Sequence, residues 1–165
     1  MISVEQLRRY PFFAGFSADQ IERLANISEE HSVDAEHYFF YEGDEIDCFY
    51  LVVEGSISIT VDIPDREHVQ SLAQQLTNDL TTRDITVSNV GSGYTFGWSA
   101  LIPPNISTAN AKANIGSRVL QFDRVKLQKA IDDDCCFGHL LTLKAAQVVR
   151  QRLRDVRMET LVEHV

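Results

Sequence analysis

Residues 91–113, GSGYTFGWSALIPPNISTANAKA, decide the fold of this chain. They begin with a Gly-Ser-Gly run, which suits a tight turn that needs a positive φ. Gly97 then precedes the run WSAL at 98–101, which two prolines follow, and this predicts a single helical turn. Gly97 leaves room for an anion at the start of that turn. The small residues of 107–113 predict a return to a sheet. This layout is typical of a phosphate cradle, and equally of a corner in a β-barrel.

Short strands separated by glycine turns are predicted on both sides of this stretch. The run CFYLVV indicates a buried strand, and the run SISITV alternates as a half-buried strand does. The predicted strands are 37–41, 48–53, 56–61, 84–90 and 118–122. Many short strands of this kind favour an antiparallel sandwich or jelly roll.

Helices are predicted before, within and after the strands. Residues 4–9 form a short helix, and Ser17 with Gln20 makes a capping box for a second one, whose buried stripe is Ile21, Leu24 and Ala25. The interruption at 62–83 carries an amphipathic helical pattern, which we place at 64–82. Its apolar positions are Val69, Leu72, Leu76 and Leu80. We expect it to cover the barrel flank or to form a loop, with partner binding as the alternative.

The C-terminal part is predicted to be helical from residue 123 onward. Asp134 suits the N-cap of a long helix that runs from about Cys135 to near the end of the chain. One seam of this helix is apolar: Ala146, Val149, Leu153 and Val156. A small barrel alone cannot cover so long a helix, so pairing with a second copy is favoured over folding back along its own barrel.

Composition limits the classes of function. The chain has 165 residues and a net charge of −9, which repels nucleic acid and anionic membrane surfaces. It lacks an apolar run long enough to span a bilayer and a signal-peptide pattern at its start, so a cytoplasmic protein is expected. Cys48, Cys135 and Cys136 show no disulfide or zinc spacing. We interpret them as small buried hydrophobic residues, with a reactive vicinal thiol pair at Cys135 and Cys136 as the alternative.

Four motifs in order resemble the cyclic nucleotide-binding domain family: PFFAGFSADQ at 11–20, YEGD at 41–44, FYLVVEG at 49–55 and GYTFG at 93–97. The resemblance covers nearly the whole chain, 1–165, as a single domain. It implies a mainly β fold with flanking helices, a jelly-roll barrel of about eight strands. N-terminal helices would occupy 1–30, the barrel 31–122 and C-terminal helices 123–165. In the family the last helix lies over the pocket and often dimerises.

The family's phosphate-binding cassette reads Phe-Gly-Glu-x-Ala-Leu, a spacer, then Arg-x-Ala. Its Glu accepts the ribose 2′-hydroxyl and its Arg holds the cyclic phosphate. This chain has Trp98 at the Glu position and Ser107 at the Arg position. The loss of a charge-assisted Arg–phosphate contact weakens binding by roughly ten- to a hundred-fold. The positions that match are Phe96, Gly97, Ala100 and Leu101. Tight binding of cAMP or cGMP in the usual way is therefore not expected.

We expect a small-ligand-sensing regulatory domain, and as the alternative a vestigial pocket in a dimerisation or protein-interaction module. The candidate pocket comprises Phe96, Gly97, Trp98, Ser99, Ala100, Ser107, Thr108 and Arg152, the last as a substitute anion partner from the C-terminal helix. A nucleotide or another small effector is the expected ligand, with no other cofactor and no metal. The five histidines lack metal-ligand spacing and no nucleophile elbow is present, so no catalysis is expected.

Overall fold

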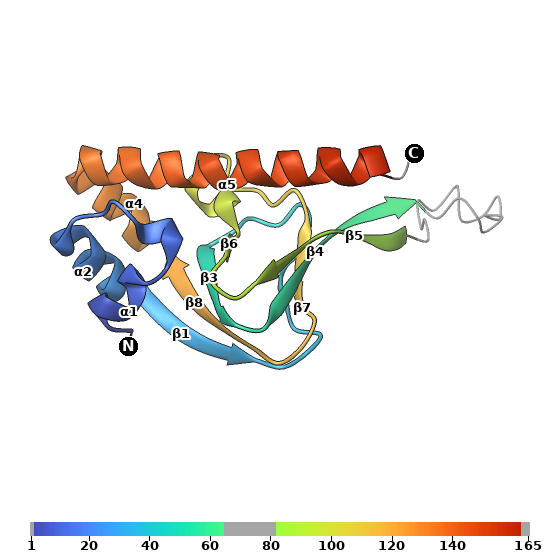
Figure 1. The fold of residues 1–165 in the computed structure, drawn as a ribbon, viewed down its shortest axis with the longest axis horizontal. Coiled ribbons are helices and arrows are strands. Elements are labelled where there is room, and N and C mark those ends of the chain that lie inside the picture. The colour runs from blue at the N-terminus through green and yellow to red at the C-terminus, as the bar shows by residue number, and fades with distance from the viewer. Residues whose placement is uncertain (1, 65–81, 163–165) are drawn as a thin grey trace.

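The computed structural model describes residues 2–64 and 82–162. Its strands form two four-stranded antiparallel sheets that enclose one core, a jelly roll (Figure 1). The first sheet has the order β1 (Ser28–Val33), β8 (Ser117–Asp123), β3 (Cys48–Glu54), β6 (Thr95–Phe96). The second has the order β2 (Tyr38–Phe40), β7 (Asn110–Ala113), β4 (Ser56–Pro64), β5 (Thr82–Gly91). The predicted fold class is thereby confirmed.

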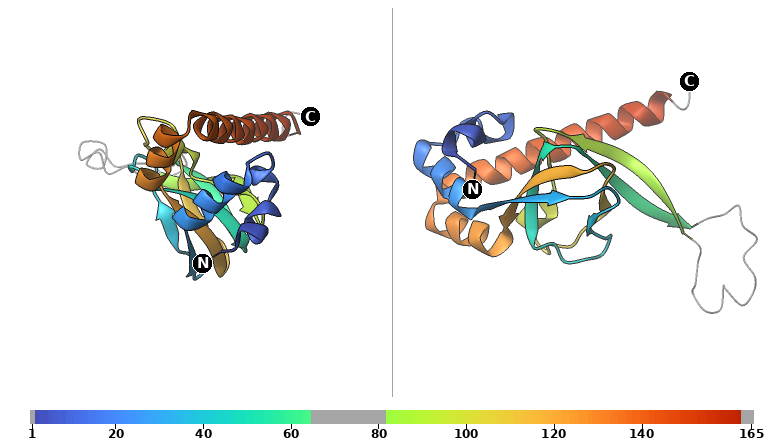
Figure 2. Two further views of the ribbon diagram at one scale, coloured as in Figure 1. Left: turned by 90° about the vertical axis from the view of Figure 1, so that its left-hand side faces the viewer. Right: turned by 90° about the horizontal axis from the view of Figure 1, so that it is seen from below.

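The helices gather at one end of the roll and along one side of it. α2 (Ala18–Ile27) packs against α4 (Arg124–Asp133). α1 (Val4–Arg8) packs against α2 and against the 3-10 turn η1 (Pro11–Phe13). α5 (Cys135–Val162) starts next to α4 and runs along the roll past β6 and β5 (Figures 1 and 2). Its inner face contributes the buried side chains of Phe137, Leu141 and Ala145.

Aromatic rings join these parts into one core. Phe13 lies 5.8 Å from Phe122 of β8 and 6.2 Å from Phe16, ring centroid to ring centroid. Phe16 in turn meets Phe137 of α5 edge-on at 5.7 Å. The N-terminal segment therefore bridges the roll and the long helix, because its rings contact both.

The predicted helix starts agree with the structure. The Ser17 hydroxyl accepts the N–H of Gln20 at 3.2 Å, and the Gln20 side chain accepts the N–H of Ser17 at 3.0 Å, the predicted capping box. Asp134 caps α5 by accepting the N–H of Phe137 at 3.0 Å. Such caps depend on neighbours in sequence, and for that reason they can be predicted from it.

Three expectations need correction. The barrel begins with β1 at Ser28, three residues before the predicted boundary, and the sequence analysis had not identified this strand. Residues 62–64 and 82–83 belong to β4 and β5, so the strands extend into the predicted insertion; the rest of the predicted helix at 64–82 lies outside the described residues. Cys48 is buried as expected, but Cys135 and Cys136 are exposed, because they occupy the outer side of the first turn of α5.

Candidate ligand-binding site

The cassette folds as the predicted single helical turn. η2 (Trp98–Leu101) is a 3-10 turn that follows Gly97 in the left-handed conformation, at φ 75° and ψ 30°. A Cβ atom on Gly97 would lie 3.1 Å from the Cys48 carbonyl oxygen and 3.1 Å from the Tyr50 ring. Glycine is thus needed both for the backbone angle and for the close approach to β3.

The far end of η2 is closed by Asn105. Its side-chain amide donates to the carbonyl oxygens of Ser99 at 2.9 Å and Ala100 at 3.1 Å. The Ser99 carbonyl oxygen also accepts the N–H of Ile102 at 3.3 Å, so Asn105 adds a second hydrogen bond there and a bond to Ala100. The Asn105 side chain therefore holds η2 to the loop that follows it.

A hollow beside η2 is nearly filled. Its cavity volume is about 20 Å³, which is room for about one water molecule, whereas small-molecule sites have roughly 300–1,000 Å³. Its lining consists of Phe40, Ile46, Ile59, Gly97, Trp98, Ser99, Ser107, Thr108 and Ala109. Five of the eight predicted pocket residues therefore meet at one place, but that place is closed in this conformation.

The Ser107 hydroxyl is occupied within its own loop. It donates to the Ala109 carbonyl oxygen and accepts the Ala109 N–H at 3.3 Å. The Ser107 backbone is held as well, by its N–H to the Asp44 carbonyl oxygen at 2.8 Å and its carbonyl oxygen from Gly43 at 2.9 Å. Ser107 is buried, so its polar groups are directed to the protein.

Two predicted pocket residues lie behind the hollow. Phe96 is fully buried and stacks on Tyr50, with centroids 4.8 Å apart and planes 10° apart. Ala100 is also buried, on the inner side of η2. Burial raises the pKa of the Tyr50 hydroxyl well above its usual range. These three residues form the wall of the roll and do not line the hollow.

Arg152 lies at the interface between α5 and β5. Its Nη1 donates to Ser88 Oγ at 2.6 Å, and Ser88 is paired across the sheet with Ile59, a lining residue of the hollow. Burial against the roll lowers the pKa of the Arg152 guanidinium from its ordinary value. The hydrogen bond holds α5 to the roll close to the cassette.

Arg152 also lines a separate cavity of about 520 Å³ between α5 and the turn that joins β5 to β6. Its walls are Pro11, Phe12, Ser92, Gly93, Tyr94, Thr95, Lys144, Gln147, Val148, Gln151, Arg152 and Asp155. Among these residues only Arg152 was predicted to bind a ligand. Some of the others lie in the motifs at 11–20 and 93–97, but the sequence does not show that these segments meet α5.

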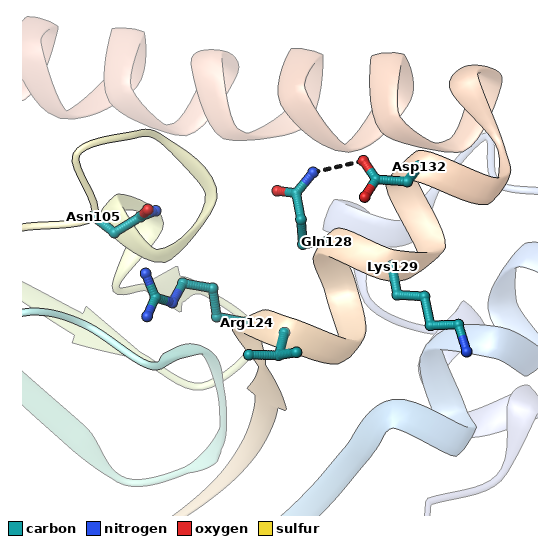
Figure 3. A pocket seen from close by; sticks show the side chains of 6 residues that line it. Asn105, Arg124, Gln128, Lys129 and Asp132 are labelled. Carbon is teal, nitrogen blue, oxygen red and sulfur yellow. Dashed lines mark hydrogen bonds between the residues drawn. The ribbon is translucent and has the colours of Figure 1, made fainter.

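A third cleft, of about 380 Å³, lies beside α4 and the loop after η2 (Figure 3). Arg124 reaches toward it, but its Nη2 is bound by Glu45 Oε1 at 2.7 Å and Asp47 Oδ1 at 3.1 Å. Gln128 Nε2 donates to Asp132 Oδ1 at 2.9 Å across the rim. Arg124 Nη2 and the Gln128 amide are thus engaged with protein partners, whereas the buried Arg124 Nε has no hydrogen-bond partner among the described residues.

The predicted seam of α5 faces away from the roll. Val149, Leu153 and Val156 have exposed fractions of 36%, 50% and 43%, and Ala146 is exposed as well. The helix therefore has two apolar faces, one packed on its own barrel and one open. The packed face corresponds to the fold-back that the sequence analysis left as the alternative.

Over residues 2–64 and 82–162, no group of three or more His, Cys, Asp and Glu side chains is arranged to hold a metal ion. Among the helices that the structure describes, none combines the length and apolarity needed to cross a bilayer.

Comparison with known proteins agrees with this geometry. The family model of the cyclic nucleotide-binding domain matches residues 30–134. A cGMP-dependent protein kinase of Caenorhabditis elegans, egl-4, is 29% identical over 154 residues, which are 93% of this chain and 17% of the kinase. The chain thus spans about a sixth of that relative's length.

Two solved structures are similar over nearly the whole chain. One is a protein from Geobacter metallireducens whose name refers to cyclic nucleotide binding, with a TM-score of 0.74, 29% identity, and coverage of 93% of this chain and 99% of that one. The other is a cyclic nucleotide-binding domain from Methylobacillus flagellatus, with a TM-score of 0.75, 18% identity, and coverage of 97% and 81%. The second likeness concerns the fold alone.

Proposed function

We propose that this chain, which belongs to the cyclic nucleotide-binding domain family, is a ligand-sensing regulatory domain. We propose further that it does not bind cAMP or cGMP through the contacts that the family usually makes. The observation that carries this proposal is the closed cassette. The Ser107 hydroxyl is bonded to Ala109, and Trp98 helps to line a hollow of about 20 Å³. The guanidinium and the carboxylate with which the family binds cyclic phosphate and ribose are both missing at these positions.

The proposal assigns no catalytic activity to the chain. The chain spans 17% of the C. elegans kinase, so the kinase's activity is not carried over. A cytoplasmic location fits three free cysteines. Direct nucleic-acid binding is not proposed, because a net charge of −9 repels the phosphate backbone.

Titration calorimetry with cAMP and cGMP tests the cassette. The unmodified chain should give weak or unmeasurable heats. The double variant Trp98→Glu, Ser107→Arg should gain affinity for cAMP by roughly ten- to a hundred-fold, because a charge-assisted contact to the phosphate is restored. Trp98→Glu, Ser107→Gln, which makes changes at the same two positions without the positive charge, is the matched control and should gain little. Tight cAMP binding by the unmodified chain would contradict the proposal.

A second candidate function is a dimerisation module whose pocket is vestigial. The observation that favours it is the open seam of α5, where Val149 and Leu153 are exposed at coiled-coil spacing. A second copy of the chain could cover this seam by pairing helix to helix, since an isologous contact uses the same residues on both copies.

Light scattering coupled to size-exclusion chromatography tests the seam. We expect the unmodified chain to elute as a dimer and Leu153→Lys to elute as a monomer, because a lysine at the seam would place two like charges opposite each other. Met158→Lys is the matched control: Met158 is 56% exposed on the same helix but lies off the seam, so this variant should stay dimeric. If the unmodified chain is a monomer even at high concentration, the proposed dimerisation function is ruled out.

A further inference from the structure

The cavity between α5 and the β5–β6 turn has the size of a small-molecule site. Its volume of about 520 Å³ falls within the range of roughly 300–1,000 Å³ that such sites occupy. It shares no lining residue with the hollow at the cassette, so it is a separate site. The largest of the three cavities described above therefore lies away from the cassette.

The walls of this cavity are held in place by the fold. The N–H of Gly93 donates to the Val52 carbonyl oxygen at 2.8 Å, and the N–H of Val52 donates to the Tyr94 carbonyl oxygen at 2.9 Å. These bonds fix the β5–β6 turn to β3. Phe12, another lining residue, is part of the buried core. A preformed site of this kind costs little ordering when a ligand binds.

The apolar part of the lining suits a flat ligand. The Tyr94 side chain is 67% exposed at the rim, while Phe12 and Val148 form deeper walls. Aromatic rings bind other flat rings by stacking or edge-on contact, and they also bury large apolar areas. An aromatic or otherwise planar apolar body therefore matches this lining.

The charged part of the lining favours an anion. Lys144 and Arg152 contribute two positive charges and Asp155 one negative charge, a local balance of +1 in a chain of net charge −9. Asp155 Oδ1 already accepts a hydrogen bond from Gln151 at 2.7 Å. Arg152 is bound to the neutral hydroxyl of Ser88, and no carboxylate of the described residues lies within ion-pair distance of it.

Asp155, on the same helix, attracts the Arg152 guanidinium, but no direct ion pair joins the two side chains. A half-buried guanidinium with no carboxylate in direct contact retains capacity for charge-assisted hydrogen bonds. It has five N–H donors in a planar fork, which matches a carboxylate, sulfonate or phosphate group. The desolvation that lowers the pKa of Arg152 also strengthens any contact with an anion, because less water competes for it.

We propose that this cavity is a second ligand site, which takes a small molecule with a planar apolar body and one anionic group. Arg152 would bind the anionic group, Lys144 would add to the attraction, and Tyr94 with Val148 would hold the planar body. The site does not require the cassette to be functional. It would place a ligand directly between α5 and the roll.

Two fluorescent probes that differ by one charged group test the site. They are 8-anilinonaphthalene-1-sulfonate and its uncharged analogue N-phenyl-1-naphthylamine. We expect saturable binding of the sulfonate with a stoichiometry of one per chain. Arg152→Gln should lower the affinity for the sulfonate by roughly ten-fold or more, because a charge-assisted contact is lost. The affinity for the uncharged analogue should not change.

Four further variants locate the probe. Val148→Trp should lower the affinity for both probes, because the larger side chain fills the cavity. Arg154→Gln removes an exposed charge two residues from Arg152 and should leave both affinities unchanged. Ser88→Ala frees the guanidinium without removing its charge, so it should keep or raise the sulfonate's affinity. Leu153→Ser reports on the open seam of α5.

The outcomes separate this site from the alternatives. If Arg152→Gln and Arg154→Gln weaken the sulfonate equally, attraction is non-specific and the proposal fails. If Leu153→Ser abolishes binding while Val148→Trp does not, the probe lies on the seam and the proposal fails. Excess cAMP should not displace the sulfonate. Displacement would show that the two ligands bind at the same site, and the proposal of a separate site would fail. Tight cAMP binding without displacement would contradict the proposed function alone and leave this site standing.

Discussion

Gly55 shows at the residue scale how closely the turn between β3 and β4 approaches β8. Its φ is +110°, and a Cβ atom there would lie 2.8 Å from the Ser117 Cα atom and still nearer to the Ser117 side chain. The Ser117 hydroxyl accepts the N–H of Ser56 at 3.3 Å, so the two segments are also hydrogen-bonded. The positive φ and the close approach of Ser117 each make any residue other than glycine destabilising at position 55.

Gly55→Ala should therefore lower the free energy of unfolding by about 3 kcal/mol or more, since a steric clash adds to backbone strain. Gly43→Ala is the matched control. Gly43 has φ +87° but no atom within 4 Å of the added Cβ, so only the strain of about 1–2 kcal/mol should appear. Urea denaturation followed by circular dichroism measures both; equal losses would show that the approach to Ser117 is unimportant.

The start of α5 is the most informative feature at the element scale. Asp134 accepts the N–H of Phe137 at 3.0 Å and the side-chain amide of Gln20 at 3.2 Å. These hydrogen bonds hold the pKa of the Asp134 carboxyl below its ordinary value, the Phe137 bond being the larger cause. The cap thus links α2 to the long helix and makes that link sensitive to acid.

The direction of the pH effect follows from this pKa. In the window between the folded and the unfolded pKa, the unfolded chain binds more protons, so acid favours unfolding. The contribution of Asp134 is fully present above the ordinary value of about 3.9 and is lost as the pH falls through the folded value. Stability of the unmodified chain should therefore decline more steeply below about pH 4 than that of Asp134→Asn.

The neighbouring variant Asp133→Asn provides the control, because Asp133 is exposed and does not cap the helix. It should follow the unmodified chain throughout an acid titration monitored at fixed denaturant concentration. An Asp134→Asn curve that is parallel to the unmodified one would mean that the cap carries no acid sensitivity.

At the scale of the whole molecule, Phe137 joins three parts of the fold. It is fully buried, it meets Phe16 of the N-terminal segment at 5.7 Å, and it belongs to the same core as Phe122 of β8. A ring at such a junction stabilises the position of α5 relative to the roll. The cavity below α5 and the open seam above it both depend on that position.

Phe137→Ala should lower the free energy of unfolding by about 3–5 kcal/mol, through lost burial and the cavity left behind. Leu143→Ala, six residues along the same helix, should cost less than about 1 kcal/mol, because Leu143 is 44% exposed. Guanidinium denaturation followed at Trp98, the single tryptophan, measures both. A small loss at Phe137 would indicate that α5 is attached mainly elsewhere.

Much of the architecture could be predicted because it depends on local patterns. The capping box at Ser17, the single turn of η2 and the cap at Asp134 each involve residues three or four positions apart. The alternating strands were identified for the same reason. β1 was missed because its burial pattern is largely exposed, so it lacks the apolar alternation by which strands are predicted.

In the candidate site, too, the local features could be predicted from the sequence and the long-range ones could not. The amino-acid sequence by itself determined the glycine turn of the cassette, the tryptophan and serine at its two ligand positions, and the apolar seam of α5. Only the tertiary structure decided that the hollow at the cassette is filled, and that residues 11–12, 92–95 and 144–155 enclose a larger cavity elsewhere. Local patterns fix which face of an element a side chain lies on. A cavity, in contrast, is the space left between faces that pack against one another, and segments far apart in the chain set its size.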